Sequence, residues 1–268
     1  MKKTILFISV GLFIGLVSRA HADPPAANQI LWLKADAGVL TNGSGTVTNW
    51  LDQSSNNNNA LLSTGYGDPK AAVTDFGLPS DHDVVRFDGN DGLRLTSDAA
   101  LRATNISIYS VCYLPTASGP QGTDTMIASF TSCCGWLQAI QGAGNVYFFT
   151  TGVIGSPTVG PDGAYSGVQG NIWACVTTTL STSTGAKKIR VDGVEKDSRT
   201  GKGVTLHTLA TATVGYYGAG LGFFVGDIAE ILVYDSVDTN QQAQVEEYLY
   251  DKYWAAPETV ETGSLSEF

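Results

Sequence analysis

A short acidic turn offers side chains that could hold a metal ion. Asp88-Gly89-Asn90-Asp91-Gly92 places the oxygen-bearing side chains of Asp88, Asn90 and Asp91 within four positions, and carboxylate and amide oxygens suit a hard cation such as calcium. The complete calcium loop Asp-x-Asp-x-Asp-Gly is missing, and tight turns use Asp-Gly steps for their own geometry. A calcium site and a purely structural turn are therefore the two interpretations of this segment.

Aromatic side chains suggest a second chemistry, because sugars stack on exposed rings and bond their hydroxyls to nearby polar groups. The candidates for ligand contact are Trp136, Tyr147, Tyr165, Tyr216 and Tyr217, with the four asparagines of residues 56–59 as polar groups of matching character. We expect Trp136 to be the most important, because it follows the unusual Cys133-Cys134-Gly135 turn. The alternative for each ring is a place in the core, where most aromatic residues of strands lie.

Cysteines suggest disulfides rather than a metal-thiolate site. Cys112, Cys133, Cys134 and Cys175 lack the Cys-x-x-Cys spacing of zinc sites, and three pairings of four cysteines are possible. We favour a bond between Cys112 and Cys175, since both lie within apolar strand-like runs. Cys133 and Cys134 would then form a vicinal pair or remain free thiols.

Motifs of the common enzyme classes are absent from the sequence. We find no Gly-x-Ser-x-Gly elbow, no phosphate-binding glycine loop and no His-Glu-x-x-His helix. His82 and His207 occupy polar, turn-like contexts, which favours solvated side chains over catalytic bases. Hydrolase chemistry of the common kinds is therefore unsupported.

The first residues indicate export from the cell. A charged start with Lys2 and Lys3, an apolar run over residues 4–17 and the sequence Ala20-His21-Ala22 form the three parts of a signal peptide. We expect cleavage after Ala22, which removes residues 1–22. No later segment is apolar for long enough to span a membrane, so we expect a secreted protein without membrane insertion.

The net charge of the exported chain limits the classes of partner that it can bind. The formal charge of −10 becomes −13 when Lys2, Lys3 and Arg19 leave with the signal peptide. Such a surface repels phosphate backbones, which argues against nucleic acid. Neutral or cationic ligands fit this charge better.

Many short strand signals predict an all-β fold. Segments rich in β-branched and aromatic residues, bounded by Gly, Pro, Asn or Asp, cover residues 30–35, 84–87, 106–114, 125–130, 136–140, 146–150, 173–179, 188–191, 211–216 and 226–234. Strands without intervening helices predict antiparallel sheets packed face to face or closed into a barrel. β-sandwiches of this length commonly form one domain, which we place at residues 23–254.

Turns and loops connect these strands. Asp162-Gly163 and Asp192-Gly193 are Asp-Gly steps that predict tight turns. Asp192-Gly193 is the clearer hairpin, because apolar strand-like residues flank it on both sides. Residues 56–59 and 152–170 are expected to form long surface loops.

Only the C-terminal part predicts a helix. Asp238 can cap it, and Val245, Tyr248, Leu249 and Tyr253 recur at the spacing of one apolar helix face. We expect this helix to lie on the sandwich. The polar, acidic tail of residues 255–268 is expected to be disordered.

Several segments, taken in order, resemble a known family. These are LWLKADAGV (31–39), WLDQSSNNNNA (50–60), VRFDG (85–89) and GDIAEILVYD (226–235), followed by a helix that ends in YLYDKY (248–253). As a set they resemble bacterial secreted LamG-like domains of the concanavalin A-like lectin/glucanase superfamily. The resemblance implies a jelly roll of two antiparallel sheets in which the first and last strands lie near each other. The strand at residues 226–234 has apolar residues on both faces, which indicates a central strand, and it could pair with the strand near residue 31.

The resemblance does not imply catalysis. Glucanases of this superfamily use the strand motif Glu-x-Asp-x-x-Glu, and lyases of similar fold use Gln-Ile-His or Gln-Val-His; none of these occurs here. Glu230 is the only carboxylate in the middle of its strand, and one carboxylate cannot serve as both acid and nucleophile.

Three functions are compatible with these observations. The first is a secreted, non-catalytic module that binds carbohydrate or mediates adhesion at the cell surface or in the matrix. The second is a structural protein whose partner is another extracellular protein, and the third is a hydrolase or lyase with unfamiliar residues. The sequence leaves the oligomeric state open.

Overall fold

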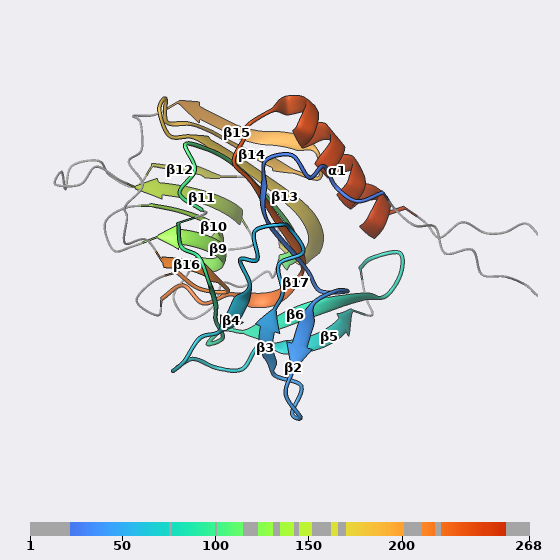
Figure 1. Ribbon diagram of the computed structural model, residues 1–268. Coiled ribbons are helices and arrows are strands. Elements are labelled where there is room, and N and C mark those ends of the chain that lie inside the picture. Colours follow the sequence, from blue (N-terminus) through green and yellow to red (C-terminus); the bar gives the residue numbers. More distant parts are fainter. Residues whose placement is uncertain are drawn as a thin grey trace, which may run out of the picture.

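Alternating apolar residues build two antiparallel sheets that stack face to face (Figure 1). The computed structural model describes residues 22–74, 77–99, 101–114, 123–130, 135–141, 145–151, 162–165, 170–200, 211–217 and 221–255. Sheet A contains, in spatial order, β15 (Val194–Thr200), β14 (Ala186–Val191), β13 (Ile172–Ser181), β8 (Asn105–Leu114), β17 (Val225–Tyr234), β6 (His82–Asp88) and β5 (Lys70–Thr74), with β1 (Gln29–Lys34) also paired to β17.

Sheet B forms the other layer. It contains, in spatial order, β12 (Asp162–Tyr165), β11 (Asn145–Thr151), β10 (Gly135–Gln141), β9 (Thr123–Phe130), β16 (Thr211–Val214), β7 (Leu93–Leu95), β4 (Ala60–Leu62), β3 (Val47–Trp50) and β2 (Val39–Thr41). The expected all-β, two-sheet antiparallel sandwich is therefore confirmed.

β17 lies at the centre of sheet A, as the sequence predicts. It pairs with β8 along one side, while β6 and β1 share its other side. Its side chains are buried on both faces from Asp227 to Tyr234, because one face meets the space between the sheets and the other meets the helix. The predicted pairing with the strand near residue 31 is also confirmed.

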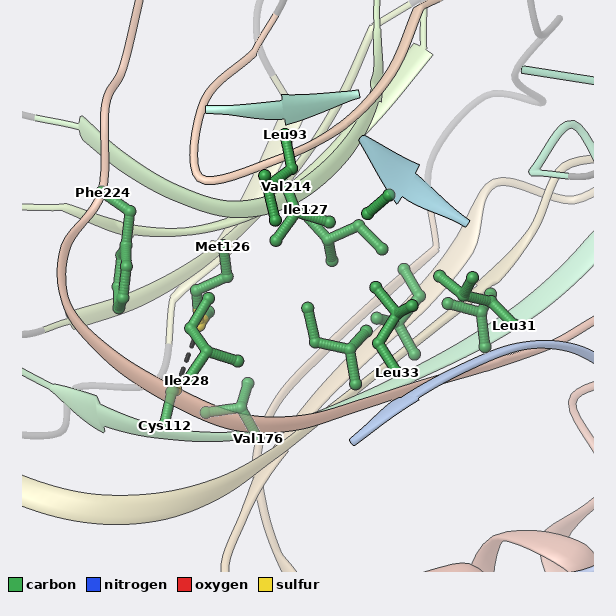
Figure 2. Packing of buried hydrophobic residues seen from close by; sticks show 14 of the residues in the cluster. Leu31, Leu33, Leu93, Cys112, Met126, Ile127, Val176, Val214, Phe224 and Ile228 are labelled. Atoms are coloured by element: carbon green, nitrogen blue, oxygen red, sulfur yellow. Dashed lines mark hydrogen bonds between the residues drawn. The ribbon is translucent and has the colours of Figure 1, made fainter. Parts of the chain in front are cut away.

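The main hydrophobic core fills the space between the sheets. Figure 2 shows Leu31, Leu33, Cys112, Val176 and Ile228 from sheet A facing Leu93, Ile127 and Val214 from sheet B. Burial of one such aliphatic side chain stabilises the fold by about 1.5–3 kcal/mol. This core holds the two sheets together and fixes the strand ends and loops that they carry.

A second apolar layer lies on the outer face of sheet A, under helix α1 (Thr239–Tyr253). Val245, Leu249 and Tyr253 are the buried residues of the helix. The Asp238 side chain accepts hydrogen bonds from the backbone N–H groups of Asn240 and Gln241 at the helix start. The predicted cap, apolar face and position of the helix on the sandwich are all confirmed.

The expected disulfide between Cys112 and Cys175 is wrong. Both thiols are free and buried. Cys112 lies opposite Ala174 and Cys175 lies opposite Val111 in the pairing of β8 with β13, so the two side chains point to opposite faces of sheet A. Cys112 belongs to the core between the sheets, where its Sγ donates to the Met126 Sδ at 3.1 Å (Figure 2), and Cys175 belongs to the layer under α1. Cys133 and Cys134 lie outside the described residues.

Every strand segment that the sequence predicts overlaps a strand of the structure. The hairpin at Asp192-Gly193 is confirmed, because both residues have positive φ and Val191 pairs with Val194 across the turn. The turn expected at Asp162-Gly163 is wrong, since these residues begin β12 and pair with β11. This strand also interrupts the long loop expected over residues 152–170.

The ends of the chain carry further predictions. Residues 1–21 and 256–268 lie outside the described residues, so the signal peptide and the disordered tail stay predictions. Within the ranges that the structure describes, no helix is both long and apolar enough to cross a membrane.

Candidate functional site

Two adjoining hollows on the surface share the side chain of Tyr66, and we call them together the Tyr66 groove. One has a volume of about 570 Å³ and the other of about 430 Å³. The lining residues are Leu61, Leu62, Ser63, Thr64, Gly65, Tyr66, Gly67, Asn90, Arg94, Leu95, Thr96, Tyr216 and Phe223. The groove lies at β4 and β7, which are neighbours in sheet B, and at the segments that follow β4 and β16.

Three aromatic rings form the floor of the groove. The Tyr66 ring lies 4.8 Å from that of Tyr216 and 5.3 Å from that of Phe223, measured between centroids. Tyr216 is only 4% exposed, and its hydroxyl shares a hydrogen bond of 3.1 Å with the Ser63 Oγ. Burial raises the pKa of Tyr216 above its ordinary value of 10.0, so its hydroxyl stays neutral. Tyr66 is half-buried, which leaves part of its ring open to the groove.

Backbone contacts across the sequence bring this floor together. The Gly67 N–H donates to the Asn90 carbonyl oxygen at 2.9 Å, and Gly67 forms a β-bridge with Asp91. A Cβ atom on Gly67 would lie 1.5 Å from the Asn90 Oδ1, and one on Gly92 would lie 2.5 Å from the Tyr216 ring. Glycine at both positions therefore permits the close approach of the loops.

Asp91 is a buried carboxylate beneath the groove, with 1% of its surface exposed. Its Oδ2 accepts a hydrogen bond of 2.8 Å from the Asp88 backbone N–H, whereas its Oδ1 is buried without a hydrogen-bond partner. Burial first, and then the neighbouring acids Asp88 and Asp68, raise the pKa of Asp91 to about 6, against the lowering effect of the Asp88 N–H.

Hydrogen bonds within the turn occupy part of its oxygen set. The Asp88 Oδ1 accepts from the Asn90 N–H at 3.3 Å, so Asp88 and Asp91 each use one oxygen to close the turn. Among the residues that the structure describes, no three or more His, Cys, Asp or Glu side chains gather closely enough to hold a metal ion. The turn geometry thus accounts for the contacts of Asp88 and of the Asp91 Oδ2, and a calcium site at Asp88, Asn90 and Asp91 stays a prediction.

The structure separates the five aromatic candidates for ligand contact. Trp136 is 0% exposed, lies in the core between the sheets and donates its Nε1 hydrogen to the Leu101 carbonyl oxygen at 3.1 Å. The expectation of an exposed Trp136 is therefore wrong, because alternation along β10 turns this position inward. Tyr216 lines the Tyr66 groove, and it is the one of the five aromatic candidates that the described lining of the groove contains.

Tyr147, Tyr165 and Tyr217 lie elsewhere on sheet B or next to it. Tyr147 is buried in a small apolar cluster with Leu137 and Ala139, and the half-buried Tyr217 contacts that cluster. Tyr165 lies opposite Tyr147 in the backbone pairing of β12 with β11, and its side chain is outside the described residues. Tyr147 and Tyr217 are not brought into the Tyr66 groove.

The asparagine run of residues 56–59 has a structural role. Asn58 is buried and donates its Nδ2 hydrogen to the Ile30 carbonyl oxygen, and Asn56 donates to that of Gln29. The Asp52 Oδ2 accepts from the Asn58 N–H at 2.8 Å, while the Asn59 Oδ1 accepts from the Asp52 N–H at 2.9 Å. These amides tie their loop to β1, so their expected role beside a ligand is not supported by their position.

Glu230 has a set of partners of its own, under helix α1 on the outer face of sheet A. Its buried carboxylate accepts hydrogen bonds from the Trp32 Nε1 at 2.6 Å, from the Tyr248 and Tyr253 hydroxyls at 2.8 Å each, and from the Lys252 Nζ at 2.7 Å. Burial and the charge of Glu230 raise the pKa of both tyrosines well above the ordinary value, so they remain donors. This carboxylate anchors helix α1 to sheet A.

Sequence patterns missed most residues of the groove. Tyr66, Arg94 and Phe223 belong to different segments, and only the fold brings them together. The one local signal is Gly65-Tyr66-Gly67, in which an aromatic residue stands between two glycines in a polar segment.

Comparisons with known proteins find the fold by structure and not by sequence. No protein-family model matches the chain, and no curated protein matches it by sequence. The chain is structurally similar to domain 4 of AbnA, an extracellular GH43 arabinanase of Geobacillus stearothermophilus solved in complex with arabinotriose. The TM-score is 0.60 and the identity 18%, over 83% of this chain and 98% of that domain.

Toxin domains share the same architecture. The binding domain of Paraclostridial Mosquitocidal Protein 1 matches with a TM-score of 0.59 and 13% identity over 82% of this chain, and a botulinum neurotoxin type C structure matches with 0.56 and 16% over 83%. The chain spans about half the length of these toxin structures, 52% and 51%. At such identities the similarity shows the fold alone, and it confirms the expected concanavalin A-like sandwich.

Proposed function

We propose that this chain is a secreted, non-catalytic module that binds a neutral carbohydrate in the Tyr66 groove. The observation that carries the proposal is a half-buried tyrosine ring at the junction of two hollows, with hydroxyl, amide and guanidinium groups along the same lining. A sugar presents an apolar face and a rim of hydroxyls, and a site for it needs both kinds of contact. The groove has both.

Each part of the groove has a distinct task in this proposal. The open part of the Tyr66 ring stacks on one sugar unit, and the Tyr216 and Phe223 rings hold it in place from below. Arg94, with 57% of its side chain exposed, donates hydrogen bonds to sugar hydroxyls. The adjoining hollow at Asn90 accommodates a second unit, so we expect an oligosaccharide rather than a single sugar.

Charge favours a neutral ligand. The chain carries a formal charge of −10, and the acids Asp68, Asp88 and Asp91 lie on the Asn90 side of the groove. A polyanionic glycan would meet repulsion there. Neutral plant or microbial polysaccharides are therefore the class to test first.

The structural neighbours support a binding role. AbnA domain 4 was solved with arabinotriose, and cell entry of botulinum neurotoxin type C depends on interaction with two ganglioside molecules. We infer the same general role here, in the LamG-like branch of the fold that the sequence motifs resemble, together with export through the N-terminal signal peptide. The alternative is a surface protein with a protein partner and no glycan ligand.

The decisive experiment measures glycan binding by the full chain and by two tyrosine variants. A glycan array and pull-downs on insoluble polysaccharides identify a ligand, with and without a calcium chelator, and calorimetry then gives its Kd. We expect Tyr66→Ala to weaken binding at least about tenfold, because an aromatic contact contributes about 0.5–1.5 kcal/mol beyond area burial. Tyr250→Ala is the matched control, since it removes an exposed tyrosine outside the groove.

The outcomes separate the alternatives. Loss of binding in Tyr66→Ala with normal binding in Tyr250→Ala supports the groove. The reverse pattern would move the glycan to helix α1, and silence of a folded sample across a broad panel would favour the protein-binding alternative. Dependence on calcium would contradict the structural interpretation of the Asp88 turn.

A further inference from the structure

A second, smaller cavity lies between helix α1 and the turn that joins β14 to β15. Its volume is about 250 Å³, and its lining residues are Cys175, Asp192, Gly193, Glu246, Glu247, Tyr250 and Trp254. None of these residues lines the Tyr66 groove. A cavity of this size holds one small group and not an oligosaccharide.

Two aromatic rings form one side of the cavity. Tyr250 and Trp254 are one helical turn apart, and their rings are nearly parallel at 12°, with centroids 6.4 Å apart. Tyr250 is 61% exposed, whereas most aromatic side chains that the structure describes are buried. Ring faces attract cations as well as apolar groups.

Three carboxylates surround the same space, and Arg190 neutralises one of them. Arg190 binds Glu246 through two hydrogen bonds of 2.9 and 3.0 Å. The Asp192 Oδ1 accepts a hydrogen bond of 2.9 Å from the Cys175 backbone N–H, which carries no formal charge. Burial raises the pKa of Asp192, against the lowering effects of this N–H and of Lys196. Glu247 is exposed at the rim.

Three carboxylates against two cations, Arg190 and Lys196, leave an excess of one negative charge beside the ring faces of the cavity. A neutral apolar ligand would contact the rings but would gain no attraction from the carboxylates, and an anion would be repelled by them. A positive charge carried on a short alkyl chain meets both features, because its carbons contact the rings and its head lies near the carboxylates.

We propose that this cavity binds a small organic ammonium ion, of the size of a butylammonium group. The ammonium lies against the Tyr250 and Trp254 rings and is attracted by Glu247 and Asp192. This site is independent of the carbohydrate proposal, since the two share no residue.

The test compares n-butylammonium with 1-butanol, which has the same alkyl chain and no charge. Trp254 fluorescence and NMR shifts report binding to the full chain at low ionic strength. A single ammonium contact of this kind gives a Kd in the millimolar range, so titration to about 100 mM covers it. We expect n-butylammonium to bind at least about tenfold more tightly than 1-butanol, and salt to weaken it.

Variants locate the site. Tyr250→Ala should weaken n-butylammonium binding about fivefold and Glu247→Gln about threefold. Tyr250→Phe keeps the ring and should bind nearly as well, while Asp235→Asn makes the same charge change as Glu247→Gln outside the cavity. Tyr66→Ala should have no effect here, which keeps this test separate from the glycan experiment.

Three results would overturn the proposal. These are equal affinity for n-butylammonium and 1-butanol, absence of saturable binding up to about 100 mM, and equal weakening by Glu247→Gln and Asp235→Asn. Because Tyr250 and Glu247 are exposed, their variants are expected to fold, and circular dichroism of each variant checks this.

Discussion

Two buried carboxylates, Glu230 and Asp91, show how differently two regions of this sandwich use polar groups. Glu230 is completely buried under α1, and four donors from β1 and the helix satisfy its two oxygens. Asp91 is almost as buried beneath the Tyr66 groove, yet only its Oδ2 has a hydrogen-bond partner. A hydrogen-bond network in which every polar atom has a partner makes a region rigid. Buried polar atoms without a partner indicate a region that is not optimised for stability alone.

The aromatic residues of the two regions follow the same division. Trp32 of β1 and Tyr253 of α1 are buried where the helix meets sheet A, with their polar atoms bonded to Glu230. Tyr66 is half-buried in the groove, where ring contacts to Tyr216 and Phe223 position it. We conclude that the polar and aromatic groups between α1 and sheet A stabilise the fold, whereas those of the Tyr66 groove are placed to contact a ligand.

The largest effect that tests this comparison is expected for Glu230→Ala. Removal of the carboxylate leaves Trp32 and two tyrosine hydroxyls without their acceptor in a buried layer and leaves Lys252 with Asp36 alone, so the free energy of unfolding should fall by about 3–5 kcal/mol. Urea denaturation followed by fluorescence measures the loss. Glu195→Ala is the matched control, because its ion pair with Lys188 is exposed and should contribute at most about 1 kcal/mol.

A small loss in Glu230→Ala, below about 1 kcal/mol, would contradict the anchoring role. It would mean that the attraction of Lys252 to Asp36, at 3.0 Å, and apolar packing of the helix are sufficient. Binding at the groove should be unchanged in any fraction of the variant that remains folded.

The sequence predicts the helix side much better than the groove side, for physical reasons. β8 and β17 are long, β-branched strands buried on both faces, and the cap and apolar spacing of α1 are local patterns. β4 and β7 have only three residues each, which is too short for alternation to be recognised. β15 was missed because VEKDSRT is charged and mostly exposed, and its hairpin to β14 holds it in place.

Side-chain direction is the quantity that sequence patterns leave undetermined. Cys112 and Cys175 lie in adjacent strands, but a register offset of one residue puts them on opposite faces. Trp136 belongs to a predicted strand, but only the pairing of β10 with its neighbours determines that its side chain points into the core. The groove depends on the bridge between Gly67 and Asp91, which joins loops that no local pattern connects.

An intermediate effect is expected for Asp91→Asn. The folded state raises the pKa of Asp91 from 3.8 to about 6, so the folded protein binds this proton more tightly than the unfolded chain does. The Asp91 contribution to stability is therefore greatest below pH 3.8, falls as the pH rises through 6, and is constant above that. Asparagine can keep the bond from the Asp88 N–H and carries no charge.

Relative to the unmodified chain, the stability of Asp91→Asn should thus increase by about 1 kcal/mol between about pH 4 and about pH 7.5, an effect limited by screening near the loop. Urea denaturation at several pH values measures it. Asp235→Asn, at an exposed position, should show no such change, and a flat difference for Asp91→Asn would indicate that its carboxylate is not strained by burial.

The smallest effect on the free energy of unfolding is expected for Arg94→Ala. This variant tests whether Arg94 contributes less to stability than Lys252, the cation bound to Glu230. Lys252 has 12% of its side chain exposed and binds two carboxylates, whereas Arg94 is 57% exposed and its Nη2 bonds to Asp98 at 3.0 Å. Asp98 also accepts from the Ala212 N–H at 2.8 Å, so it keeps a partner when Arg94 is removed. The free energy of unfolding should change by less than about 0.5 kcal/mol.

Affinity for the glycan found on the array should nevertheless fall about three- to tenfold, since exposed guanidinium donors are accessible to sugar hydroxyls. Arg199→Ala removes a comparable exposed arginine, paired with Asp197 on β15, and should leave affinity unchanged. A stability loss above about 1 kcal/mol in Arg94→Ala would show that its side chain is used by the fold, as that of Lys252 is. Unchanged affinity with unchanged stability would instead mean that the Arg94 guanidinium does not contact the ligand. The evidence that the groove binds a ligand while the region under α1 stabilises the fold would then come from Tyr66 alone.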